Sequence, residues 1–143
     1  MAAGDIAFLV TTWDADRAAL ERVRRSVFVH EQGFREQDEF DQEDPAAIHV
    51  LATLKREPVG TGRLNLAGKI GRIAVIPGLR GRGAGAGILR LLLQEARHRG
   101  IREPFLHAQL QAVPFYEKFG FTCEGEVFDE AGILHLRMKH AAE

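Results

Sequence analysis

The sequence has little that would cross-link it, anchor it in a membrane or give it a strong net charge. Its 143 residues include one cysteine, Cys123, which excludes an intrachain disulfide and indicates a reducing compartment. Lys and Arg number 19 and Asp and Glu number 20, so the formal net charge is -1. A chain so balanced has no global attraction to nucleic acid or to an anionic membrane, and we expect neither as a partner.

Long apolar segments are also missing. The longest apolar runs, such as 88–93, are far too short to span a bilayer. The first five residues show neither the basic nor the apolar region of a signal peptide. We therefore expect a soluble cytoplasmic protein.

The composition is that of a folded domain, with 45% hydrophobic and 27% charged residues. The length suits one domain over residues 1–143. Periodicity and turn residues predict strands at 6–11, 48–54, 58–66, 69–76, 102–107, 121–128 and 133–139. They predict helices at 15–28 (capped by Asp14), 83–99 and 111–119, and a polar loop at 30–45. The order β-α-β-β-β-α-β-α-β-β indicates one mixed α/β domain built on a single sheet.

The connection between the strand at 69–76 and the next helix carries the strongest chemical signal. Four glycines alternate with other residues there: Gly81, Gly83, Gly85 and Gly87. Glycine allows positive φ and close approach to the backbone. A helix start also offers unpaired N–H groups and the positive end of its dipole. Together these features predict a binding site for a pyrophosphate, with Arg80 and Arg82 adding positive charge at its rim.

Other interpretations of these glycines exist. They would suit a tight strand-to-helix connection, although each weakens a helix start by up to about 1 kcal/mol. Gly81-x-Gly83-x-x-Ala86 also matches the degenerate dinucleotide fingerprint, which would make the chain a nucleotide-binding domain. Against this, the turn follows an antiparallel meander, and no acidic residue ends the next strand. A Walker P-loop is excluded because no Gly-Lys-Ser/Thr follows the glycines.

The residues from Arg80 to Gly85 resemble the Arg/Gln-x-x-Gly-x-Gly/Ala signature of GNAT acetyltransferases. The segment 73–77 (IAVIP) resembles the bulged, splayed central strand of that family. Segments 25–33 and 111–121 are similar to small bacterial members of the ElaA-like type, so the resemblance covers nearly the whole chain. It implies a single-domain GNAT-like α/β fold with a mixed, mostly antiparallel, splayed sheet flanked by helices.

The resemblance also implies an N-acyltransferase that transfers the acetyl group of acetyl-CoA to a primary amine by direct attack in a ternary complex, without a metal. Backbone amides of 82–86 would bind the CoA pyrophosphate, and backbone groups of 73–75 would pair with the pantetheine arm. Gln109 stands where many relatives carry an asparagine that contacts this arm. The cofactor-binding residues expected on this basis are Ile73, Ala74, Val75, Arg80, Gly81, Arg82, Gly83, Ala84, Gly85, Ala86 and Gln109.

Acyl transfer needs deprotonation of the amine, stabilisation of the oxyanion and protonation of the leaving thiolate. Tyr116, the only tyrosine, matches the family's general acid, and the alternative is a core tyrosine with a bonded hydroxyl. The candidates for the base are Glu31, His49 and a relay through water. An unperturbed histidine has a pKa of ~6.5, which suits a base at neutral pH. The N–H of Val75 would stabilise the oxyanion.

Seven carboxylates crowd the segment 31–44, opposed within it by Arg35 alone: Glu31, Glu36, Asp38, Glu39, Asp41, Glu43 and Asp44. They form either a solvated surface or an acidic funnel that favours a cationic amine. The six histidines show no metal-binding spacing, so we expect no metal. A noncatalytic acyl-CoA-binding or sensing module remains an alternative function, and a homodimer, common in the family, remains open.

Overall fold

The computed structural model describes residues 5–140. Residues 1–4, on which most of the signal-peptide expectation rests, and residues 141–143 lie outside this range. The described residues form one seven-stranded sheet in the order β1-β2-β3-β4-β5-β7-β6. Its strands are β1 (Ala7–Thr11), β2 (Ile48–Leu54), β3 (Glu57–Leu64), β4 (Lys69–Val75), β5 (Phe105–Gln109), β6 (Phe121–Glu130) and β7 (Ile133–His140). Only β4 and β5 pair in parallel, so the sheet is mixed and mostly antiparallel as predicted.

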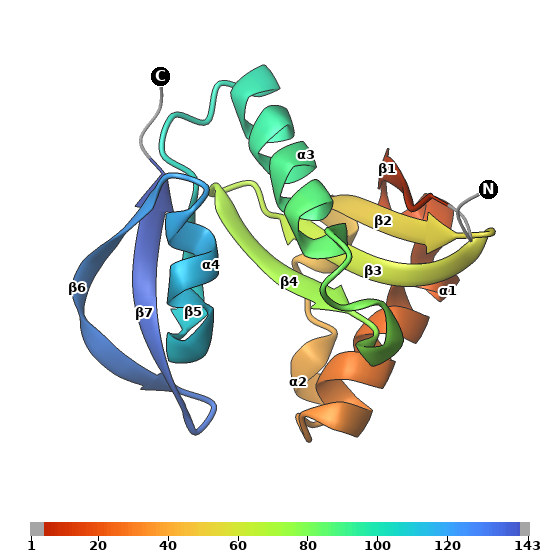
Figure 1. Ribbon diagram of the computed structural model, residues 1–143, viewed down its shortest axis with the longest axis horizontal. Coiled ribbons are helices and arrows are strands. Elements are labelled where there is room, and N and C mark those ends of the chain that lie inside the picture. Colours follow the sequence, from red (N-terminus) through yellow and green to blue (C-terminus); the bar gives the residue numbers. More distant parts are fainter. Residues whose placement is uncertain (1–4, 141–143) are drawn as a thin grey trace.

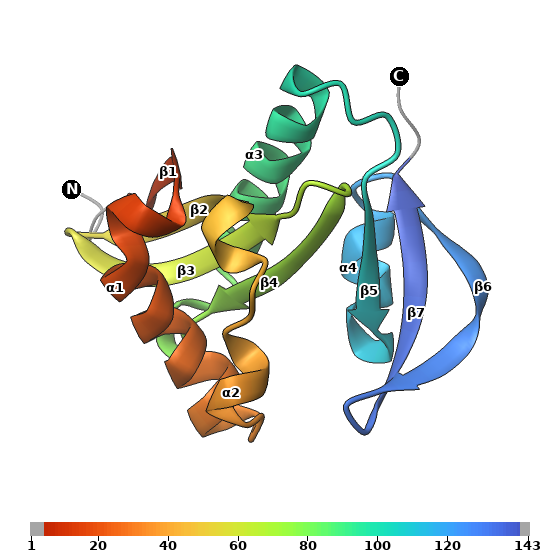
Figure 2. The ribbon, with the colours of Figure 1, turned by 180° about the vertical axis from the view of Figure 1, so that it is seen from behind.

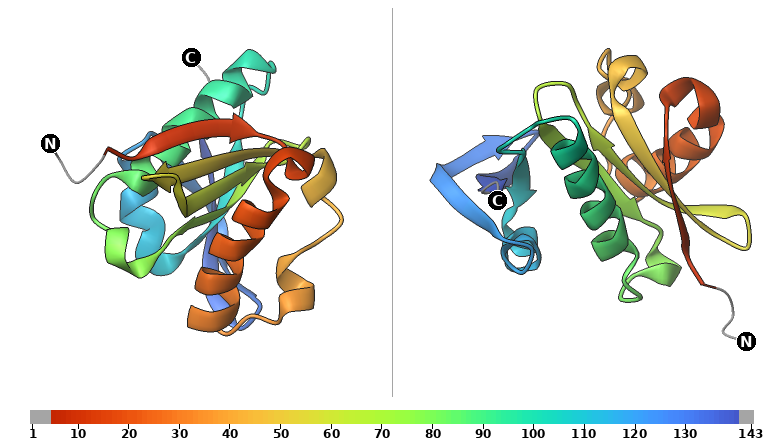
Figure 3. Two further views of the ribbon diagram at one scale, coloured as in Figure 1. Left: turned by 90° about the vertical axis from the view of Figure 1, so that its right-hand side faces the viewer. Right: turned by 90° about the horizontal axis from the view of Figure 1, so that it is seen from above.

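Helices cover both faces of this sheet (Figures 1 and 3). They are α1 (Trp13–Arg24), α2 (Glu36–Glu39), α3 (Ala84–His98) and α4 (Val113–Glu117). In the view from above, α3 lies on one side of strands β2 to β4, and α1 with α2 lies on the other. None of the helices within residues 5–140 is long and apolar enough to cross a membrane.

The sheet splits along its middle. β4 and β5 pair only at Lys69 with Phe105 and at Ile70 with Leu106, and beyond these pairs the two strands diverge (Figure 2). A β-bulge in β4 accompanies the split, because Arg72 has a φ of 53° and the register with β3 shifts beside it. Thr61 on β3 donates its hydroxyl hydrogen to the Arg72 carbonyl at 2.9 Å, which holds the bulge in place. The expected bulged and splayed central strand is therefore present.

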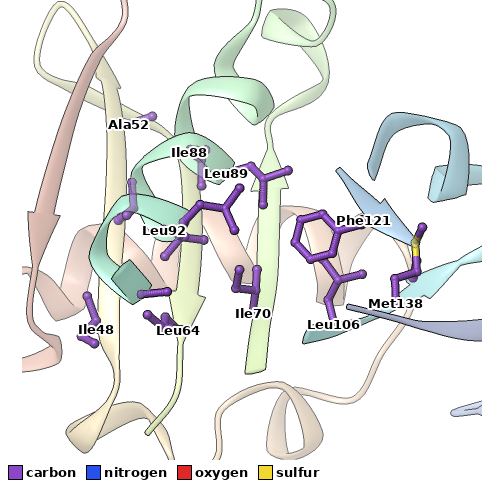
Figure 4. Packing of buried hydrophobic residues seen from close by; sticks show 14 of the residues in the cluster. Ile48, Ala52, Leu64, Ile70, Ile88, Leu89, Leu92, Leu106, Phe121 and Met138 are labelled. Atoms are coloured by element: carbon purple, nitrogen blue, oxygen red, sulfur yellow. The ribbon is translucent and has the colours of Figure 1, made fainter. Parts of the chain in front are cut away.

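The main core joins the two halves where β4 and β5 still pair (Figure 4). Ile88 and Leu92 of α3 lie over Gly62 of β3, and both are fully buried. A Cβ at Gly62 would stand 2.5 Å from Ile88 Cγ2, so only glycine lets the helix pack this closely. Burial of each such side chain contributes about 1.5–3 kcal/mol, which anchors α3 and the turn that precedes it.

The N-terminal helix differs from the prediction. Its cap is Thr12 rather than Asp14, because the Thr12 hydroxyl accepts the backbone hydrogen of Ala15 at 3.1 Å. After Arg24 the chain continues as a π-helical segment, Arg25–Glu31, and the predicted loop at 30–45 contains α2 and the 3₁₀ turn Asp44–Ala46. β5 also begins at Phe105 rather than 102, after Pro104, which has no N–H for a ladder.

Candidate active site

The glycine turn leads from β4 through the 3₁₀ turn Pro77–Leu79 into α3. Gly81 and Gly83 have φ values of 82° and 85°, a conformation that strongly favours glycine. Gly83 is the N-cap of α3 and provides no side-chain cap. Within residues 5–140, no carbonyl or side chain accepts a hydrogen bond from the amides of 82–86. These amides and the positive end of the dipole of a 15-residue helix supply the donors and the charge that an anion-binding site needs.

Arg80 has a different role from the one predicted at the rim of this turn. Its guanidinium donates two hydrogen bonds to the Glu31 carboxylate, at 2.7 and 2.6 Å, and one to the Val75 carbonyl at 2.8 Å. Arg80 therefore ties the turn to the end of the π-helical segment. Because Glu31 neutralises the charge of Arg80, Arg82 is the arginine of the two that can add positive charge at the rim.

The same ion pair bears on Glu31 as a candidate base. The hydrogen bond from Arg80, together with its charge, lowers the pKa of Glu31 below its ordinary value. Glu31 is also absent from the lining of the cavity that contains Tyr116. A carboxylate held this way is a poor proton acceptor, so the structure does not support Glu31 as the base.

The backbone of β4 presents alternate residues to the split. The amide of Ile76 donates to Val59 on β3 at 3.0 Å, and the Arg72 carbonyl also faces β3. Ile73 and Val75 therefore direct their backbone groups toward the split, as expected for contacts with a pantetheine arm. The Val75 carbonyl is occupied by Arg80, which leaves its N–H.

The backbone groups of Ala74 face β3 instead of the split. Its backbone pairs with Thr61 on β3, and its side chain is buried against Val23 and Val27. The predicted contact between Ala74 and a cofactor arm is thus replaced by sheet pairing and packing, because residues of a strand alternate in direction.

A cavity of about 440 Å³ lies between the diverging strands and the helical segments before β2. Tyr116 of α4 lines it, and the ring packs edge-on against Phe115 and Phe121. The Tyr116 hydroxyl forms no hydrogen bond with another residue among 5–140 and is not fully buried, unlike the core tyrosine with a bonded hydroxyl that the sequence left as an alternative. Burial raises the pKa of Tyr116 to about 12, so the phenol carries its proton at neutral pH.

Gln109 lines the same cavity at the end of β5. Its side-chain oxygen accepts a hydrogen bond from Gln111 at 2.6 Å. Phe115 connects this region with the glycine turn, since a Cβ at Gly85 would lie 3.7 Å from Phe115 Cζ. Phe115 thus links the glycine turn to α4, the helix that contains Tyr116, while no residue of the turn lines the cavity itself.

His49 is elsewhere. It is 1% exposed, stacks near Trp13 with ring centroids 5.3 Å apart, and donates from Nε2 to the Asp44 carbonyl at 2.9 Å. Burial lowers the pKa of His49 below its ordinary value despite this hydrogen bond. His49 does not line the cavity, so the structure gives it a role in packing the loop 41–46 against β2 and not one as the base.

The acidic segment is not opposed by Arg35 alone, as the sequence suggested. Each of its seven carboxylates forms an ion pair with an arginine, mostly from distant parts of the chain. The pairs are Glu31–Arg80, Glu36–Arg25, Asp38–Arg35, Glu39–Arg24, Glu39–Arg72, Asp41–Arg63, Asp41–Arg72, Glu43–Arg63, Asp44–Arg24 and Asp44–Arg63. The negative charge expected of an acidic funnel is therefore neutralised within the fold.

Three cavity residues were missed as functional candidates: His107, Glu130 and His135. His107 Nδ1 and Glu130 Oε1 are 2.8 Å apart, and His135 Nε2 lies 3.9 Å from Glu130 Oε2. The sequence held a signal, because His107 and His135 alternate with apolar residues in their strands and so share a polar face. Within residues 5–140, no group of three or more His, Cys, Asp or Glu side chains could hold a metal ion.

The glycine turn with unpaired amides and the splayed sheet are the features by which the sequence resembles the GNAT acetyltransferases. A family model, the acetyltransferase (GNAT) domain, matches residues 15–142, and the chain belongs to this family. It is therefore an N-acetyltransferase by family, and enzymes of this family use an acyl-CoA as the donor.

Among relatives, the chain is 36% identical over 133 residues to the uncharacterised protein YyaT of Bacillus subtilis, covering 89% of this chain and 90% of YyaT. It is 33% identical over 129 residues to protein ElaA of Escherichia coli, covering 84% of each. The crystal structure of ElaA matches with a TM-score of 0.84 at 28% identity over 94% of this chain and 99% of ElaA. An acyl-CoA N-acyltransferase from Pseudomonas aeruginosa matches with a TM-score of 0.84 at 25% identity, covering 96% of this chain and all of the other. The predicted family, its ElaA-like type and the predicted fold class are confirmed.

Proposed function

We propose that this protein transfers the acetyl group of acetyl-CoA to a primary amine by direct attack, with both substrates bound at once. The observation that carries the proposal is the pairing of an uncapped amide turn at 82–86 with a cavity that contains an unbonded phenol, Tyr116. These amides and this phenol have no hydrogen-bond partner among residues 5–140, so both remain free to bind a substrate.

The residues around the turn suit CoA in shape and charge. A Cβ at Gly81 or Gly83 would meet nothing within 4 Å, so the space in front of these amides is open. The amides of 82–86 and the side chain of Arg82 would bind the pyrophosphate. The backbone of Ile73 would then pair with the pantetheine arm, and the N–H of Val75 would stabilise the oxyanion.

The reaction requires a balanced transfer of protons. The acceptor ammonium loses one proton to a base, and the amine nitrogen attacks the thioester carbonyl carbon. As the C–S bond breaks, the sulfur gains a proton and the nitrogen loses its second one, which leaves an amide, free CoA thiol and one proton released to solvent. We assign the protonation of sulfur to Tyr116 as general acid.

The high pKa of Tyr116 determines how this acid acts. A phenol that titrates at about 12 is a weaker acid than a thiol near ~8.5, so full transfer to a free thiolate is uphill by about 5 kcal/mol. Tyr116 therefore donates its hydrogen bond as the C–S bond breaks and recovers a proton from the nitrogen in the same event. Its buried site keeps it protonated and ready to donate over the whole neutral range.

The test begins with acetyl-CoA. Calorimetry on the wild-type protein is expected to give binding, and thiol release over a panel of primary amines is expected to identify acceptors. A Gly83→Val variant should remain folded, because the new side chain faces open space, but its positive φ and bulk should abolish acetyl-CoA binding. Gly78→Val, in the neighbouring 3₁₀ turn with equally open space and no positive φ, is the matched control.

Two results would contradict the proposal. One is unchanged acetyl-CoA affinity in a folded Gly83→Val variant. The other is a wild-type protein that binds acetyl-CoA and acetylates none of the amines, which would favour the noncatalytic acyl-CoA-binding module.

A further inference from the structure

The cavity wall opposite β4 contains a cluster of acid–base groups that the proposed function leaves unassigned. Its members are His107 on β5, Glu130 at the end of β6 and His135 on β7. The turn after Glu130 consists of Ala131 and Gly132, with φ values of 56° and 81°, which is the signature of a tight two-residue hairpin. This turn directs Glu130 back over the sheet face on which both histidines stand.

The hydrogen bond between His107 and Glu130 determines which ring nitrogen is free. Glu130 accepts at 2.8 Å, so Nδ1 of His107 carries the hydrogen and Nε2 of the neutral ring has a lone pair. Phe128 packs edge-on against the imidazole with centroids 5.0 Å apart, which fixes the ring plane. The arrangement matches the orientation of a catalytic imidazole by a carboxylate.

His135 is oriented differently. Its Nδ1 donates to the Ile133 carbonyl at 2.7 Å, and its Nε2 lies 3.9 Å from Glu130 Oε2. The side chain of His135 is also only 8% exposed, whereas that of His107 is 23% exposed. His107 is therefore the imidazole that an acceptor can reach.

The other carboxylates at the cavity are already engaged. Asp38 pairs with Arg35, and the hydrogen bond from Arg35 lowers the pKa of Asp38 below its ordinary value. Glu39 is 4% exposed and pairs with Arg24 and Arg72. Since Glu31 and His49 do not line the cavity, His107 is the base candidate that combines an oriented ring with access to the cavity.

We propose that His107 is the general base that deprotonates the acceptor amine, with Glu130 as the positioning residue that orients its ring. The assignment rests on the proposed function and names the group that takes the proton there. Nε2 of His107 accepts one proton from the acceptor ammonium and later releases it to solvent, while the amine nitrogen forms its bond to the acetyl carbon. Glu130 stays ionised and stabilises the imidazolium.

The electrostatic surroundings are consistent with that role. Partial burial opposes ionisation of Glu130, but the hydrogen bond from His107 and the charges of Lys69, His107 and His135 lower its pKa below the ordinary value. The other charged groups that face His107 come from several elements. They are Arg137, opposite it on β7, and Lys69, Arg72, Asp38 and Glu39 around the cavity, together with the neutral phenol of Tyr116.

The experiment compares the pH dependence of kcat/KM for His107→Gln, His135→Gln and Glu130→Gln, with an acceptor amine found for the wild type. His98→Gln, on the exposed end of α3, is the control. His107→Gln should lose roughly 10²–10⁴-fold in kcat and the acidic limb of the profile, with acetyl-CoA affinity unchanged by calorimetry. Added imidazole should restore part of the rate of His107→Ala.

Glu130→Gln keeps a hydrogen-bond acceptor without the charge. Its kcat should fall, but less than that of His107→Gln, with the KM for the amine nearly unchanged, because the ring keeps a hydrogen-bond acceptor while the imidazolium loses its counter-charge. His98→Gln and His135→Gln should keep the wild-type acidic limb.

The inference is overturned if His107→Gln keeps the wild-type rate or acidic limb, or if the limb disappears in His135→Gln instead. Those results require an active wild-type protein and leave the proposed function intact. An inactive wild type contradicts the proposed function itself, and the base assignment with it.

Discussion

Replacement of Arg24 by methionine should destabilise the protein strongly, although Arg24 touches no proposed substrate. Its guanidinium is fully buried beneath α1 and donates four hydrogen bonds, two to Glu39 and two to Asp44, at 2.7 to 3.1 Å. The rings of Trp13 and Phe40 lie within 5.4 and 5.1 Å of its central carbon. This arrangement fastens the acidic segment to the first helix.

The magnitude follows from what the substitution leaves behind. Methionine fills much of the volume but supplies no donors, so two buried carboxylates lose their common partner. Removal of one member of a buried ion pair costs about 3–5 kcal/mol. For a chain of this size that corresponds to a melting temperature lower by about 6–20 °C.

Calorimetric or chemical unfolding of Arg24→Met and Arg17→Met measures this effect. Arg17 lies on the same helix, and its side chain is 64% exposed in an ion pair with Glu21, so the control should cost less than about 1 kcal/mol.

The pH dependence provides a second readout. Burial raises the pKa of Glu39 despite its arginine partners, so its charge costs stability above the folded pKa, and this cost disappears as the pH falls through that value. Loss of Arg24 increases the cost. The destabilisation by Arg24→Met should therefore be largest at neutral pH and smaller in mild acid. Equal melting temperatures for the two variants, or a destabilisation that grows in acid, would refute this reasoning.

The remaining predictions concern activity. Tyr116→Phe should lower kcat by roughly 10²–10⁴-fold and leave the melting temperature and acetyl-CoA affinity unchanged, since the hydroxyl has no hydrogen bond within residues 5–140 to lose. A lower melting temperature with kcat preserved would instead assign Tyr116 to packing. The value of kcat/KM for amine acceptors should vary by less than about twofold between low and high salt, because the acidic segment is neutralised by arginines. A steep fall of kcat/KM with salt, measured by thiol release, would instead support the acidic funnel.

Several site features were predictable because their signals are local. The glycines at 81 and 83 encode a positive-φ turn, and the leucines that follow encode an amphipathic helix. Resemblance over segment 111–121 made Tyr116 the expected general acid, and the structure brings Tyr116 to the cavity wall. The identity of the base was not predictable in this way, because it depends on which side chains meet across different strands.

The sequence by itself therefore determined the order of elements, the anion turn and the family, since each depends on residues within a few positions of one another. Tertiary structure alone decided which charges remain available. Glu31 meets Arg80 across 49 positions, and His107 meets Glu130 across 23. A charge pattern read along the chain records where carboxylates are but not which cations the fold brings to them. Because Coulomb energies depend on separation in space, only the folded chain shows that the acidic segment is neutralised while an imidazole stays open to the cavity.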